Sequence, residues 1–89
     1  MASKVEFSPV ADRELGKLDP QHAKRILKFL SSRLARLDNP RSIGQALQGQ
    51  RFGEFWKYRV GDYRLICKIE DKHVLILVLQ IGHRREIYR

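Results

Sequence analysis

The sequence predicts one α+β domain in which two helices pack on one face of a small, mostly antiparallel, four-stranded sheet. Three observations support this fold class. Apolar residues recur at helical spacing in the first half of the chain, the period changes to two after Phe52, and the elements follow the order strand, helix, helix, three strands. The chain has 89 residues, too few for two separate cores, so residues 1–89 are expected to form a single domain.

Two proline signals mark the predicted helix starts. Residues 4–7 alternate polar and apolar side chains, as a short strand would. Ser8-Pro9 then supplies an N-cap and a proline at the first helical position, and Asp19-Pro20 repeats the signal for a longer helix that ends before Asn39-Pro40. The longer helix is expected to bury a stripe formed by Ala23, Ile26, Leu27, Leu30, Leu34 and Leu37.

The second half of the chain is predicted to form three strands. Their expected ranges are residues 54–59, 63–70 and 73–81, with residues 41–51 as a loop before them. Residues 74–79 are apolar at every position, so the last strand should lie inside the sheet with both faces covered. Gly82 is expected to end that strand.

Gly61-Asp62 is a glycine-first dipeptide suited to a two-residue type II′ hairpin turn. In that register Arg59 faces Arg64, and Lys57 lies on the same face because strand side chains alternate with a period of two. Like charges directly opposite each other are destabilising. These three residues, called the cationic patch below, therefore indicate a site for an anionic ligand.

Composition favours a polyanionic partner. The formal net charge is +8, with a sequence pI near 10.2. The single cysteine, Cys67, excludes an intrachain disulfide, suits a reducing compartment and is expected to be buried. The start of the chain is polar and no apolar run approaches the ~20 residues needed to span a bilayer, so we expect a cytoplasmic protein.

Basic residues also gather in two further places. The second helix carries a basic face, which is interpreted either as a solvated surface or as a contact for RNA or an acidic partner. The chain ends Ile-Gly-His-Arg-Arg-Glu-Ile-Tyr-Arg, which is either a basic tail or a cluster that a turn at Gly82 brings beside the hairpin. This second cluster comprises His83, Arg84, Arg85 and Tyr88.

The candidate chemistry is that of phosphodiesters. No metal-ligand spacing, glycine-rich phosphate loop or Ser-His-Asp grouping is visible, and no cofactor is expected. Arginine forks bind phosphate oxygens, and tyrosine stacks on unpaired bases. RNA carries its own nucleophile in the 2′-OH, so its cleavage needs only a base, an acid and a cationic group that stabilises negative charge on the phosphate. Lys57 is the first candidate for the base.

Two stretches resemble one family. Residues 56–66, Trp-Lys-Tyr-Arg-Val-Gly-Asp-Tyr-Arg-Leu-Ile, and the chain ending are similar to the hairpin and C-terminal signatures of the RelE/ParE toxin superfamily, RelE branch. The resemblance implies the toxin half of a toxin–antitoxin pair, with a RelB-like antitoxin as its partner in a hetero-oligomer. It also implies metal-free cleavage of mRNA in the ribosomal A site by 2′-OH attack, leaving a cyclic phosphate.

The resemblance also implies roles for individual residues. Lys57 matches a family lysine that acts either as the base or in stabilising charge, and Arg64 matches the arginine that holds the scissile phosphate. Arg84 matches the arginine at the leaving group. Tyr88 matches the tyrosine that orients the cut nucleotide. RNA-binding roles fall to Arg59, His83 and Arg85.

Two departures from the family pattern affect these assignments. Phe55 stands where the best-known members carry a further lysine, so His83 and Tyr88 remain alternatives to Lys57 as the base. The interval from Arg84 to Tyr88 is also two residues shorter than in those members.

Two other functions stay open: a ParE-like, non-enzymatic gyrase inhibitor, and a basic module that binds RNA or antitoxin without catalysis.

Overall fold

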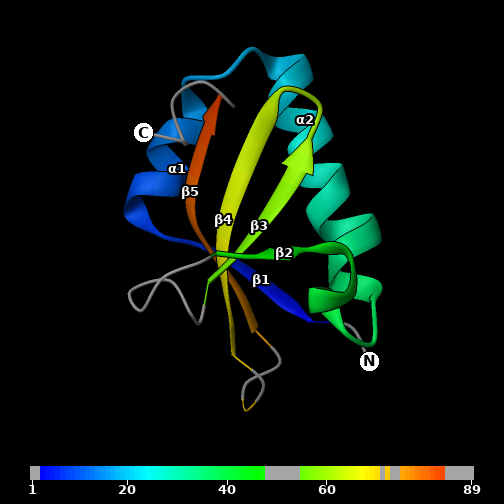
Figure 1. Cartoon of the computed structure of the whole chain (residues 1–89). Coiled ribbons are helices and arrows are strands. Elements are labelled where there is room, and N and C mark those ends of the chain that lie inside the picture. Colours follow the sequence, from blue (N-terminus) through cyan, green and yellow to red (C-terminus); the bar gives the residue numbers. More distant parts are fainter. Residues whose placement is uncertain (1–2, 48–54, 71, 73–74, 84–89) are drawn as a thin grey trace.

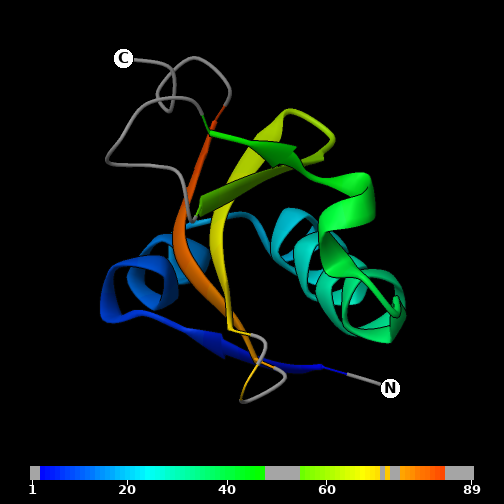
Figure 2. The same ribbon diagram turned by 60° about the horizontal axis from the view of Figure 1, so that its bottom comes forward.

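The structure, a computed structural model, describes residues 3–47, 55–70, 72 and 75–83. One sheet with strand order β1-β5-β4-β3-β2 has both α-helices on the same face (Figures 1 and 2), which confirms the predicted α+β class. β1 runs parallel to β5 and the other pairs are antiparallel. The elements are β1 Lys4–Phe7, α1 Pro9–Gly16, α2 Pro20–Lys28, β2 Gln45–Ala46, β3 Phe55–Val60, β4 Tyr63–Glu70 and β5 Leu75–His83.

The sheet has five strands rather than the expected four. Gln45 and Ala46, predicted as part of a loop, pair with Lys57 and Trp56 and add β2 at the edge. A two-residue strand is too short to show any alternation in the sequence. The prediction that Gly82 ends the last strand is also wrong, since Gly82 lies within β5 and pairs with Arg64 of β4.

The second helix is less regular than its sequence pattern suggested. After α2 the chain continues as a π-helical turn, Phe29–Arg33, and a short 3₁₀ turn, Leu34–Arg36. Ile26, Leu30 and Leu34 are buried as predicted, but Leu27 is 41% exposed. One residue turns an α-helix by about 100°, so Leu27 lies at the margin of the stripe, beyond the sheet. None of the helices in the described residues is long and apolar enough to cross a membrane.

The hydrophobic core lies between the helices and one face of the sheet. The alternation of β4 places Leu65 and Cys67 on this face, and both are fully buried. Tyr58 on β3 is also buried, with its ring centroid 6.1 Å from that of Phe29 and its hydroxyl donating to the Pro40 carbonyl at 2.8 Å. The expected burial of Cys67 is therefore confirmed.

The side chains of Ser8 and Glu14 form hydrogen bonds with the backbone of β5, beyond the point where its pairing with β1 ends. β1 pairs with β5 only as far as Val78, and a register shift in β5 follows beside Cys67 of β4. The Ser8 hydroxyl donates to the Leu79 carbonyl at 2.9 Å and accepts from the N–H of Ala11 at 3.1 Å, which caps α1. Further along, Glu14 Oε1 accepts from the N–H of Ile81 at 2.9 Å. These bonds satisfy edge groups that no strand covers.

Gly44 and Gly16 offer a matched test of packing around Tyr58. A Cβ at Gly44 would lie 2.8 Å from the Cε1 atom of Tyr58, whose ring cannot move without losing its hydrogen bond. We expect Gly44→Ala to lower the free energy of unfolding by about 1–3 kcal/mol. Gly16→Ala, with no neighbour within 4 Å in helix α1, should leave stability unchanged or raise it by up to about 1 kcal/mol. Urea unfolding of both variants measures the difference, and equal effects would contradict this packing.

Burial raises the pKa of the Cys67 thiol to about 12, from a usual value of 9.0. The unfolded chain therefore releases this proton first as the pH rises. Between about pH 9 and pH 12, Cys67 should lower the free energy of unfolding by about 1.4 kcal/mol per pH unit. We expect Cys67→Ala to remove this part of the alkaline slope in urea titrations at several pH values. Parallel slopes for the two proteins would show that the thiol is not buried as described.

Candidate functional site

The β3–β4 hairpin has the register that the sequence predicted. Arg59 pairs with Arg64, and Lys57 pairs with Ile66. Gly61 has a φ of +60°, which the first position of a two-residue hairpin turn requires and which glycine adopts without strain. Residues directly opposite each other share a face of the sheet, so the three members of the cationic patch lie together on the face away from the helices.

Arg64 is held by the hairpin turn itself. Its Nη1 atom donates to the carbonyl of Gly61 at 3.3 Å and to that of Tyr63 at 3.2 Å. Arg64 is 7% exposed, and it is the charged residue that the described part of the chain buries. Arg59 opposite is exposed, and Lys57 is half-buried. The patch thus combines one enclosed, hydrogen-bonded guanidinium with an exposed one beside it.

His83 lies on the other face of the sheet. It pairs with Tyr63, and the two rings meet edge to face with centroids 5.8 Å apart, on the same side as the helices. Gly82, its neighbour in β5, is the residue that pairs with Arg64. The structure therefore does not bring His83 to the cationic patch. Arg84, Arg85 and Tyr88 lie outside the described residues.

The pKa of Tyr58 is strongly raised. Burial is the main cause, the nearby thiol of Cys67 adds to it, and the positive charge of Arg41 opposes it. Tyr58 and Cys67 both point into the core, beneath the sheet, and remain neutral at physiological pH. Their role is structural, and neither is a candidate acid or base.

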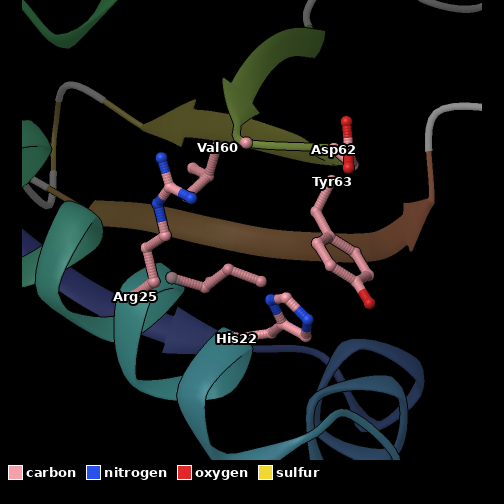
Figure 3. A pocket seen from close by; sticks show the side chains of 7 residues that line it. His22, Arg25, Val60, Asp62 and Tyr63 are labelled. Carbon is pink, nitrogen blue, oxygen red and sulfur yellow. The ribbon is translucent and has the colours of Figure 1, made fainter.

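Sequence reasoning missed a cavity between α2 and the hairpin turn. This cavity, called the hairpin pocket below, has a volume of about 290 Å³ (Figure 3). His22 is half-buried there, with its ring centroid 5.2 Å from that of Tyr63. The lining residues are His22, Arg25, Ile26, Val60, Gly61, Asp62 and Tyr63. Helical spacing placed His22 and Arg25 on one side of α2, but no sequence signal indicated that this side meets the hairpin tip.

Comparisons with known proteins agree on one superfamily. Residues 5–88 match the family model described as the ParE toxin of the type II toxin–antitoxin system parDE. The chain is 35% identical to toxin RelG of Mycobacterium tuberculosis over 100% of this chain and 99% of that protein. It is 31% identical to toxin RelE of the same organism over 96% of this chain and 84% of that protein.

A solved structure shows the same fold. The toxin–antitoxin complex RelBE2 of M. tuberculosis contains a chain that matches with a TM-score of 0.85 and 29% identity, covering 97% of this chain and 95% of that one. The fold, the family model and the relatives together establish that this chain belongs to the RelE/ParE superfamily of toxins from type II toxin–antitoxin systems.

Proposed function

We propose that this toxin is a RelE-type endoribonuclease that cuts mRNA in the ribosomal A site without a metal ion. The observation that supports this best is the pairing of Arg59 with Arg64, with Lys57 on the same face of the sheet. Two arginines directly opposite repel each other, and a phosphodiester would relieve that repulsion. Both curated relatives described above are Rel toxins.

Arg64 acts in this proposal as the clamp on the scissile phosphate. Its two hydrogen bonds to described residues both use Nη1. The opposite edge of the guanidinium, Nε and Nη2, can then bind two phosphate oxygens as a fork. Low exposure strengthens such charge-assisted bonds, because less water competes for them. The turn carbonyls fix the clamp before the substrate arrives, as electrostatic stabilisation of a transition state requires.

The reaction is an internal transfer at phosphorus. The ribose 2′-oxygen attacks the adjacent phosphorus while a base takes its proton, the P–O5′ bond breaks, and an acid protonates the departing 5′-oxygen. The products are a 2′,3′-cyclic phosphate and a free 5′-OH. Lys57 is preferred to His83 as the base because it shares a face with Arg64. Arg84 at the leaving group, Tyr88 on the nucleotide and Arg85 on RNA remain proposals from the family resemblance.

The matching family model is named for ParE toxins, so inhibition of DNA gyrase is a second candidate function. A ParE-like toxin would inhibit DNA gyrase without catalysis, and would cause double-strand DNA breaks while mRNA stays intact. A binding module would hold RNA tightly and cut nothing, even with ribosomes present. The cationic patch favours an RNA-directed function over gyrase inhibition, because a phosphodiester relieves the repulsion between Arg59 and Arg64. Mapping of mRNA cuts distinguishes the nuclease from the binding module.

A RelB-like antitoxin is the proposed protein partner, in a hetero-oligomer within the cytoplasm. The similar M. tuberculosis chain was solved in a toxin–antitoxin complex. A net charge of +8 suits a partner with an acidic segment that covers the patch and excludes mRNA.

Arg64→Ala should reduce the rate of mRNA cleavage by on the order of 10²–10³-fold, which is the usual effect of removing one hydrogen-bond donor to the transition state. The measurement is mapping of mRNA 5′ ends after brief induction, together with growth. Arg64→Lys should keep the positive charge but restore little cleavage, because an ammonium cannot form the two-pronged contact. Arg13→Ala, an exposed arginine of α1, is the matched control and should cut normally. Full toxicity of a folded Arg64→Ala protein would refute this site.

Coexpression with the gene next to the toxin gene should restore growth and abolish the mRNA cuts. The two proteins should also copurify as a complex, with lower yield at high salt because the interface would be electrostatic. Size-exclusion chromatography with light scattering gives the stoichiometry. A toxin that arrests growth regardless of its neighbour would rule out this pairing.

A further inference from the structure

The hairpin pocket lies on the opposite face of the hairpin from the cationic patch. One wall is α2, which contributes His22, Arg25 and Ile26, and the other is the β3–β4 turn (Figure 3). Its volume of about 290 Å³ is close to the lower end of the range for small-molecule sites. It can therefore hold a small planar group, but no folded segment.

Part of the pocket lining is apolar and aromatic. Ile26 and Val60, 1% and 6% exposed, form the apolar part of the lining. The rings of His22 and Tyr63 lie 5.2 Å apart with a tilt of 50°, and both residues are only half-buried. The ring of His83 also contacts Tyr63 edge to face, with centroids 5.8 Å apart. Two neighbouring aromatic rings of this kind offer a stacking surface for a nucleobase.

A cation stands at the entrance to the pocket. Arg25 is exposed, and its Nη1 atom lies 3.0 Å from where a Cβ of Gly61 would be. The glycine thus leaves room for the guanidinium against the turn. Within residues 3–47, 55–70, 72 and 75–83, Arg25 forms no ion pair, although Asp62 also lines the pocket. A phosphate group is a fitting counter-ion for this guanidinium.

We propose that the hairpin pocket binds one unstacked RNA nucleotide, with its base against His22 and Tyr63 and its phosphate at Arg25. This subsite rests on the proposed RNA-cleaving function. Tyr63 and Arg64 are consecutive residues on opposite faces of β4. An RNA strand bound to Arg64 by one phosphate can therefore pass over the two-residue turn and place a nearby base in the pocket. A bare phosphate site would not explain the two rings or the apolar lining.

The test is an NMR titration of the purified, ¹⁵N-labelled protein with each of the four nucleoside 5′-monophosphates, and with inorganic phosphate alone. We expect saturable shifts at the backbone amides of His22, Gly61, Asp62 and Tyr63, with affinity for at least one nucleotide about tenfold above that for phosphate. Shifts with phosphate of equal affinity would reduce the pocket to an anion site and overturn the proposal. Shifts confined to Arg59 and Arg64 would do the same.

Two variants and a matched control assign the contacts. His22→Ala should weaken nucleotide binding about tenfold without changing phosphate binding, since one stacking ring is lost. Arg25→Gln should weaken both. Lys24→Gln, an exposed cation on the same helix that does not line the pocket, should change neither. Unaltered nucleotide affinity in a folded His22→Ala protein would overturn the stacking role.

Nucleotide binding in the hairpin pocket can be tested independently of the proposed nuclease activity. Nucleotide binding by the isolated protein requires neither ribosomes nor cleavage. Arg64→Ala should therefore keep its nucleotide affinity in the pocket while it loses mRNA cleavage. Binding without any mRNA cuts in the native protein would refute only the nuclease, and cuts without binding in the pocket would refute only this subsite.

Discussion

The register of the β3–β4 hairpin is the constraint on which the rest of the molecule depends. A shift of one residue would exchange every side chain between the two faces of the sheet. The register is fixed at the tip, where the positive φ of Gly61 permits a two-residue turn. It sends Leu65 and Cys67 into the core and Arg59 and Arg64 to the opposite face. Core and candidate site are thus two consequences of one turn.

The sheet behind the hairpin is held in place by α1. β5 pairs with β4 along its whole length, but β1 covers its other edge only as far as Val78. Ser8 and Glu14 bind the backbone of Leu79 and Ile81 and replace the missing strand. Because Ser8 also caps α1, one hydroxyl joins the start of a helix to a strand 71 residues away in sequence. The end of β5, beside Tyr63, is positioned by these contacts.

Alternation and turn chemistry were enough to predict the strands, the Arg59–Arg64 pairing and the burial of Cys67, because these depend on local geometry. The two residues of β2 gave no periodic signal, and Gly82 looked like a strand end because glycine usually weakens a strand. The position of His22 in the hairpin pocket could not be predicted, for a different reason. Its environment is created by the approach of α2 to a turn about forty residues later, and tertiary contacts of that kind leave no pattern in the sequence.

The nearly buried position of Arg64 is a cost to stability that the proposed function would explain. Burying a guanidinium is costly unless its donors are satisfied. Here two backbone carbonyls of the turn satisfy one nitrogen, while Arg59 across the pair adds repulsion instead of relief. An apolar residue would suit the folded state better at this position. Under the proposed function, a bound phosphate would supply a negative charge that the described residues do not place beside Arg64, and the hairpin would then reach its lowest electrostatic energy in the complex, as a preorganised anion site requires.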